Sequence, residues 1–127
     1  MASHEQAMSL GIKDVVARLI DILGLSLVAK LTGVSETRAV QQWTNGREPQ
    51  QPQLLRFALQ LALIVTAAGD GTVARAWFQG SNPHLDDRSP AEMMRTMKLT
   101  EIQAPLAAAA RAFAARSSNE SQPNSQG

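Results

Sequence analysis

Apolar residues recur at helical spacing through the first third of the chain. Between residues 12 and 23 they fall mostly three or four positions apart, at Ile12, Val15, Val16, Leu19, Ile20 and Leu23, which predicts an amphipathic helix. The pattern resumes after Gly24 and predicts a second helix to about Thr32, ended by Gly33 in the left-handed position that glycine favours. Ser35 is a suitable N-cap for a third helix through Trp43.

The segment 53–68 has the broadest apolar surface of the chain. Only Gln53, Arg56 and Gln60 form a polar strip on a helical wheel, and nearly every other residue is apolar. A helix of this kind is buried by several neighbours or by a second subunit, and the second possibility predicts a homodimer through this helix. The segment is too short and too polar to cross a membrane.

Three further helices complete the predicted fold. One covers residues 72–79, and a loop with Asn82-Pro83 follows it. Ser89-Pro90-Ala91-Glu92 has the residues of a capping box before a helix that ends near Lys98. The last helix spans residues 100–116, where Pro105 requires either an irregular first turn or a later start near Gln103.

These elements predict an all-α fold of about six or seven helices. We expect a helix-turn-helix head at residues 1–50 and a small C-terminal helical bundle at 51–116. Residues 117–127 are rich in Gln, Ser and Asn, which is typical of a disordered tail. The first ten residues are polar and are expected to be loose.

Charge and composition narrow the classes of function. The 127-residue chain contains no cysteine, which excludes disulfides and thiolate chemistry and fits a cytoplasmic location. Residues 1–50 balance five basic against five acidic side chains, so the head lacks the basic excess that is usual in proteins bound to phosphates.

The residues required for catalysis are scarce. The chain has two histidines: His4 falls in the segment expected to be loose, and His84 lies close to Asp86 and Asp87. All three fall in one polar loop with no further ligand nearby, so we predict no metal site there. No phosphate-binding loop or serine–histidine arrangement is present either. We therefore expect a binding protein without a cofactor or a small-molecule substrate, and not an enzyme.

Residues 25–47 carry the most informative pattern. Small Ala29 allows two helices to cross closely, Gly33 turns the chain, and Trp43 fixes the second helix, which is the layout of a helix-turn-helix. Gln and Arg on its outward face can read adenine and guanine edges. The candidate DNA-binding residues are Ser35, Thr37, Arg38, Gln41, Gln42, Asn45 and Arg47. The segment alone supports DNA reading and an ordinary solvated surface about equally.

The chain also resembles the Xre/MbcA/ParS family of antitoxins over residues 12–116. In the head the similar residues are 33–35 and 40–46. In the second half they are Ala74-Arg-Ala-Trp-Phe78, Asn82-Pro-His-Leu85, Ser89-Pro90 and Ala108-Ala-Ala-Arg-Ala-Phe113. The ordered set Trp-Phe, Asn-Pro-x-Leu and Ser-Pro is more specific than the head.

The resemblance implies an antitoxin of a type II toxin–antitoxin module. Its C-terminal domain would block a RES-domain toxin that consumes NAD, its head would bind the operator of its own operon, and the protein would be a homodimer. The residues implied in toxin binding are Trp77, Asn82, Leu85, Arg95, Arg111 and Arg116. From the residues alone, Trp43 and Trp77 are expected in the core, and Asn82 is expected to form a rigid turn anchored by Leu85.

Two other functions stay open from the sequence. A stand-alone helix-turn-helix regulator would bind DNA without any toxin partner. A phage or prophage adaptor would bind a protein through the C-terminal bundle and retain a head without DNA binding. An enzyme would require a metal or cofactor to accompany the purified protein.

Overall fold

The computed structural model describes residues 11–121, with side chains as far as Arg116. This range contains seven α-helices, one 3-10 helix and no strand beyond an isolated bridge, which confirms the predicted all-α fold. The elements are α2 (Ile12–Leu23), α3 (Leu25–Thr32), α4 (Thr37–Thr44), α5 (Pro52–Thr66), α6 (Gly71–Gln79), η1 (Pro83–Leu85), α7 (Pro90–Thr96) and α8 (Leu99–Ser121). None of the described helices is both long and apolar enough to cross a bilayer.

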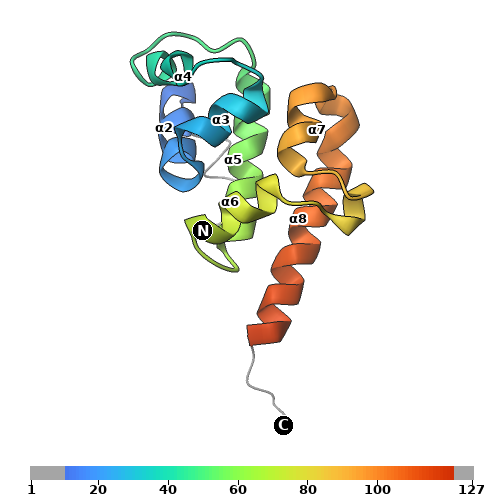
Figure 1. Cartoon of the computed structure of the whole chain (residues 1–127). Coiled ribbons are helices and arrows are strands. Elements are labelled where there is room, and N and C mark those ends of the chain that lie inside the picture. Colours follow the sequence, from blue (N-terminus) through green and yellow to red (C-terminus); the bar gives the residue numbers. More distant parts are fainter. Residues whose placement is uncertain (1–10, 122–127) are drawn as a thin grey trace.

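Helix α5 lies at the centre of the molecule. In Figure 1 it stands between α2 and α3 on one side and α7 and α8 on the other, with α6 beside its C-terminal end. Helix α2 packs against α5 and α6, and α3 packs against α7. The buried side chains from α2 to α8 therefore form one continuous core, and residues 1–50 and 51–116 do not enclose separate cores in the part described.

The apolar breadth of α5 is explained by neighbours within the chain. Its buried residues include Leu55, Leu59 and Leu61, each fully shielded from water. Helices α2, α6 and α8 cover it, and Gln53 stays exposed while Arg56 and Gln60 are half-buried. A second subunit is therefore not needed to bury this helix. The broad apolar surface of α5 no longer supports the prediction of a homodimer through it.

The turn between α3 and α4 confirms one predicted boundary and corrects another. Gly33 is left-handed, with φ of 80°. Its N–H donates to Lys30 O, and the N–H of Val34 donates to Ala29 O, as in a Schellman motif. The predicted N-cap was wrong, because α4 begins at Thr37 after Glu36, and no side chain caps it.

Helix α8 is longer than the sequence predicted. It begins at Leu99, where the backbone N–H of Lys98 donates to Glu101 Oε1 at 3.1 Å. A tight i to i+3 bond from Glu101 N–H to Lys98 O forms the first turn, and Pro105 lies inside the helix. The helix continues through residues 117–121, which were predicted to be disordered. The predictions for residues 1–10 and 122–127 lie outside the described part.

Side chains of the second half hold the ends of the head helices. Arg75 on α6 donates from Nη1 to Ile22 O at 3.0 Å, at the C-terminal end of α2. A cation is favourable there because helix C-termini carry partial negative charge. Gln51 donates from Nε2 to Thr32 O at 2.9 Å, at the end of α3. The head is thus fixed to the rest of the molecule by polar contacts as well as by the core.

Candidate functional site

A cavity of about 330 Å³ lies between α6, α8 and the loop that follows α6. We call it the α6–α8 cavity. On α6, Asp70 caps the helix by accepting from the N–H of Val73 at 3.2 Å. Helical spacing then brings Val73, Ala76 and Trp77 to one face of α6. The lining residues are Val73, Ala76, Trp77, Gly80, Ser81, Asn82, Pro83, His84, Ala109, Phe113 and Arg116.

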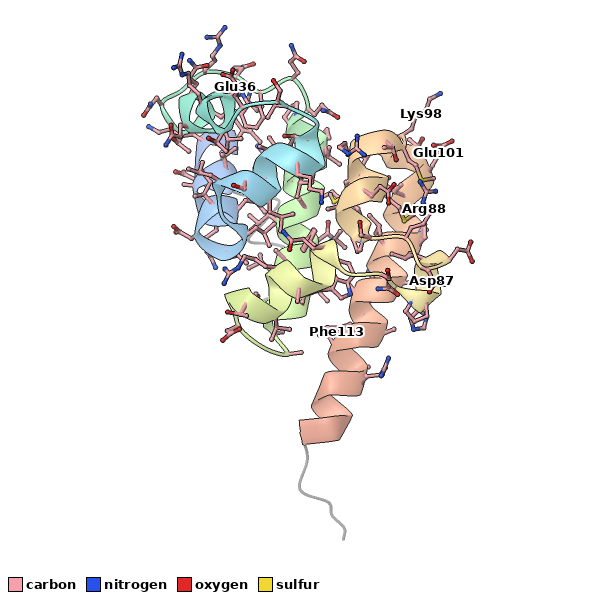
Figure 2. The ribbon with its side chains drawn as sticks, viewed as in Figure 1. Glu36, Asp87, Arg88, Lys98, Glu101 and Phe113 are labelled. Atoms are coloured by element: carbon pink, nitrogen blue, oxygen red, sulfur yellow. The ribbon has the colours of Figure 1, made fainter. Side chains whose placement is uncertain are left out.

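Helix α8 supplies the opposite wall of this cavity. Ala109, Phe113 and Arg116 recur at intervals of four and three residues, so they share one face of the helix. Figure 2 places Phe113 on the side of α8 toward α6. Phe113 is only half-buried although it is aromatic. The two facing stripes therefore leave space between them where small Ala76 and Ala109 lie.

Asn82 organises the loop that forms the rim of the cavity. Its side chain, 8% exposed, accepts a hydrogen bond from the N–H of His84 at 2.9 Å. Its carbonyl accepts from the N–H groups of Leu85 and Asp87, both at 2.9 Å. Leu85 is buried below the loop. The predicted turn, with Asn82 bonded to nearby backbone and Leu85 as its anchor, is confirmed.

The polar atom of Trp77 has no partner. The side chain is 7% exposed and its ring meets Phe78 edge to face, with centroids 5.0 Å apart. The Nε1 atom is shielded from water, and none of the described residues supplies an acceptor for it. Buried indole N–H groups usually find an acceptor, because leaving one unpaired is costly. The indole of Trp77 therefore keeps an unpaired hydrogen-bond donor in the interior of the protein.

Comparison with known families places this cavity in a functional context. Residues 61–108 match the family model of the antitoxin Xre/MbcA/ParS C-terminal toxin-binding domain. The matched segment supports an antitoxin of the Xre/MbcA/ParS family. The match confirms the resemblance over residues 61–108, which include α6, η1, α7 and the start of α8. The head lies outside the match, and so do Ala109, Phe113 and Arg116 of the cavity. Neither the curated proteins nor the solved structures gave a match.

The residues predicted to bind a toxin do not form one surface. Trp77, Asn82 and Arg116 all line the α6–α8 cavity. Arg111 is exposed, but its position on the wheel is turned away from the stripe of Ala109 and Phe113. Arg95 lies against the turn at Gly33, at the junction with α3, and not at the cavity.

The candidate DNA-binding residues also divide between two surfaces. Thr37, Arg38, Gln41 and Asn45 are exposed and occupy one arc of α4 and its C-terminal end. Figure 2 shows Glu36 at the start of this helix, at the end of the molecule away from the C-terminus of α8. Ser35 is exposed just before α4.

Gln42 and Arg47 lie on the flank of α4. Gln42 is half-buried, and its Oε1 accepts from Arg47 Nη1 at 3.5 Å. Both residues line a second cavity, of about 430 Å³, between the Gly33 turn, α4 and the segment 47–51. Their side chains are therefore directed away from the arc that presents Arg38 and Gln41.

The loop with His84 contains two strained residues. Asp86 and Asp87 have φ of 56° and 64°, in the left-handed region that Asp tolerates better than most residues. The part of the chain that the structure describes has no cluster of three or more His, Asp or Glu side chains able to hold a metal ion.

Sequence reasoning missed four apolar residues of the cavity. Val73 and Ala76 on α6, and Ala109 and Phe113 on α8, fall at helical spacing in the sequence, but none of the four was predicted as a site residue. The stripes themselves were visible from the spacing of residues. Whether two stripes close on each other or leave a cavity depends on the angle and distance between helices, which residue spacing does not determine.

The contribution of Asn82 to the stability of the loop after α6 can be measured. We expect Asn82→Ala to lower the free energy of unfolding by about 1 kcal/mol, because it removes the part-buried hydrogen bond from His84 N–H to the Asn82 side chain. Urea denaturation followed by circular dichroism measures this, with the exposed Ser81→Ala as control. Equal midpoints for the two variants would contradict the role of Asn82.

Proposed function

We propose that this chain is an antitoxin that binds and blocks a RES-domain toxin that consumes NAD, with the α6–α8 cavity and its rim as the contact region. The match of residues 61–108 to a toxin-binding domain carries this proposal. The cavity lies within or just beyond those residues and joins an apolar wall to exposed polar groups on the rim. This combination is typical of protein–protein contacts. The RES identity of the toxin follows the resemblance stated from the sequence.

The chain acts in this proposal by occupying a surface and not by catalysis. Binding to the toxin would keep NAD out of the toxin's active site. Both proteins would meet in the cytoplasm, where NAD and the operator are found. Whether the antitoxin also forms a homodimer, as the resemblance implies, is a separate prediction that light scattering of the purified chain measures.

The experiment that tests the proposal uses the product of the gene next to that of the antitoxin. Expression of that product alone should lower cellular NAD and stop growth, and co-expression of the antitoxin should restore both. A chain that is produced and folded but leaves NAD depleted would contradict the proposed function.

We also propose that α4 reads the operator of the same operon. The exposed arc of Arg38, Gln41 and Asn45 supports this, since these side chains can form paired hydrogen bonds with base edges. The neutral balance of the head predicts weak binding with a shallow salt dependence, because few phosphates are neutralised. We therefore expect Arg38, Gln41 and Asn45 to contact the bases, whereas Gln42 lies on the flank of α4 beside Arg47.

The exposed residues Arg38 and Gln41 of α4 give a specific prediction for DNA binding. The double substitution Arg38→Ala with Gln41→Ala should weaken binding to the upstream region about tenfold or more, because each good base contact contributes about 1–3 kcal/mol. Fluorescence anisotropy at low salt measures the change. Arg111→Ala on α8 is the matched control. Equal affinities for the double variant, the control and the unchanged chain would refute this role of α4.

A further inference from the structure

Two exposed cations of the second half lie near the turn that leads into α4. Arg95 is in the last turn of α7, and Lys98 lies between α7 and α8. We propose that residues 95–99, which we call the α7–α8 corner, bind the phosphate backbone of the operator beside the bases that α4 reads. This inference rests on the proposed reading of DNA by α4 and adds a second contact surface to it.

The Gly33 turn fixes the position of Arg95 relative to α4. A Cβ at Gly33 would lie 3.8 Å from Cγ of Arg95, and α3 packs against α7. Helix α4 begins at Thr37, and the four residue steps from Gly33 to Thr37 span at most about 14 Å. The major groove of B-DNA is about 12 Å wide. When α4 lies in the groove, phosphates along one edge of the groove therefore come within reach of a long side chain at residue 95.

The α7–α8 corner and α4 lie at the same end of the molecule. Figure 1 shows α4 and the junction between α7 and α8 at the end opposite the C-terminus of α8. Glu36 and Lys98, both exposed, are labelled at this end in Figure 2. A duplex bound across this end can contact both surfaces at once.

The two cations of the corner are available to an external anion. Within the described residues, no ion pair or hydrogen bond involves the side chain of Arg95 or Lys98, although Glu92 lies one turn before Arg95 on α7. Glu101 is close to Lys98, and its Oε1 accepts from the backbone N–H of Lys98 at 3.1 Å. This places the carboxylate at the N-terminus of α8, whose partial positive charge offsets it. Residues 95–99 themselves contain no carboxylate.

The neutral charge of the head explains why such cations would matter. Five basic and five acidic side chains cancel in residues 1–50, and Glu36 is exposed at the start of α4, where it repels phosphate. Much of the affinity of a protein for DNA comes from cations that neutralise phosphates. Arg95 and Lys98 supply these cations from outside the head. Contacts to phosphate position the protein on the duplex and carry no sequence information directly.

Variants that remove charge and keep side-chain length test this proposal. They are Arg95→Met and Lys98→Met, alone and together. Methionine keeps an unbranched stem, so the packing of residue 95 against the Gly33 turn is retained. Arg111→Met, at an exposed position farther along α8, is the matched control, and Arg95→Lys preserves the charge. Fluorescence anisotropy over a range of salt concentrations measures affinity for the upstream region and for a shuffled duplex of equal length. Circular dichroism checks the folding of each variant.

We expect each single methionine variant of the corner to weaken binding to both duplexes by the same factor, about fivefold to tenfold at about 0.1 M salt. The slope of log K against log salt concentration should become shallower by about 1 in each single variant and by about 2 in the double variant. Arg95→Lys and Arg111→Met should bind as the unchanged chain does. Arg38→Ala with Gln41→Ala should instead reduce the preference for the upstream region over the shuffled duplex.

The outcomes separate the corner from α4. An unchanged salt slope in the double methionine variant overturns the proposal and leaves reading by α4 intact. An equal loss in Arg111→Met would be an effect of net charge alone and would also overturn it. A double variant that keeps its DNA affinity but binds the product of the neighbouring gene more weakly in titration calorimetry assigns the corner to the toxin. Absence of binding to either duplex by the unchanged, folded chain overturns both this proposal and the role of α4.

Discussion

Phe78→Ala should lower the free energy of unfolding by about 3–5 kcal/mol, which is the usual loss when a buried phenylalanine is truncated. Phe78 is fully shielded from water on α6. It also supports the ring of Trp77 by an edge-to-face contact at 5.0 Å. A domain of this size is stable by only about 5–15 kcal/mol, so the variant should lose roughly a fifth or more of its stability. Urea denaturation followed by circular dichroism measures the loss.

The same substitution at Phe113 is the matched control for Phe78. Phe113 is half-buried and lines the cavity, so truncation should reduce stability much less and should weaken toxin binding instead. Similar losses of stability at both positions would show that Phe113 belongs to the core. The cavity would then be closed in solution.

Leu59→Ala should destabilise both ends of the molecule together, by about 2–5 kcal/mol. Leu59 is fully buried on α5, which packs against α2 on one side and α8 on the other. Because the core is continuous, unfolding should be one transition. The two tryptophans report on it separately, since Trp43 lies in the head and Trp77 beside the cavity.

The measurement uses Leu59→Ala in chains that retain one tryptophan. Fluorescence of Trp43 alone and of Trp77 alone should give the same urea midpoint, lowered equally by Leu59→Ala. Leu99→Ala, at the half-buried start of α8, is the control and should have a smaller effect. Two different midpoints would indicate that residues 1–50 and 51–116 unfold as separate domains.

Helix boundaries could be predicted from the sequence better than the packing of the helices against one another. Gly33, Ser89 and Pro90 mark helix ends through their own backbone preferences, so these ends could be read from the chain. The Ser89 side chain indeed accepts from the N–H of Glu92 at 3.1 Å. Ser35 was misassigned because α4 begins beyond it, and a serine close to a helix start is only one of several residues that can precede it.

The breadth of α5 shows where sequence reasoning stops. Its composition predicts burial on most sides, but it does not distinguish neighbours in the same chain from a second subunit. The positions of Arg95 and Arg111 were unpredictable for the same reason, because both are exposed arginines in helices. The packing of α7 and α8 against the rest of the molecule places Arg95 at the Gly33 turn and Arg111 away from the cavity.

The cavity itself depends on small differences in side-chain size. Ala76 and Ala109 leave space where larger residues would close the contact between α6 and α8. The sequence identified Trp77 and Asn82 as candidates through the resemblance, and the structure adds Phe113 and the unpaired indole donor. The donor could not be predicted, since a partner for Nε1 could have come from any neighbouring element.

Titration calorimetry of the purified chain with the purified product of its neighbouring gene tests the account most directly. Saturable binding is predicted, with a negative heat-capacity change from burial of apolar surface at the cavity. A folded antitoxin that gives no binding heat at any temperature, and that forms no complex on gel filtration, would contradict it.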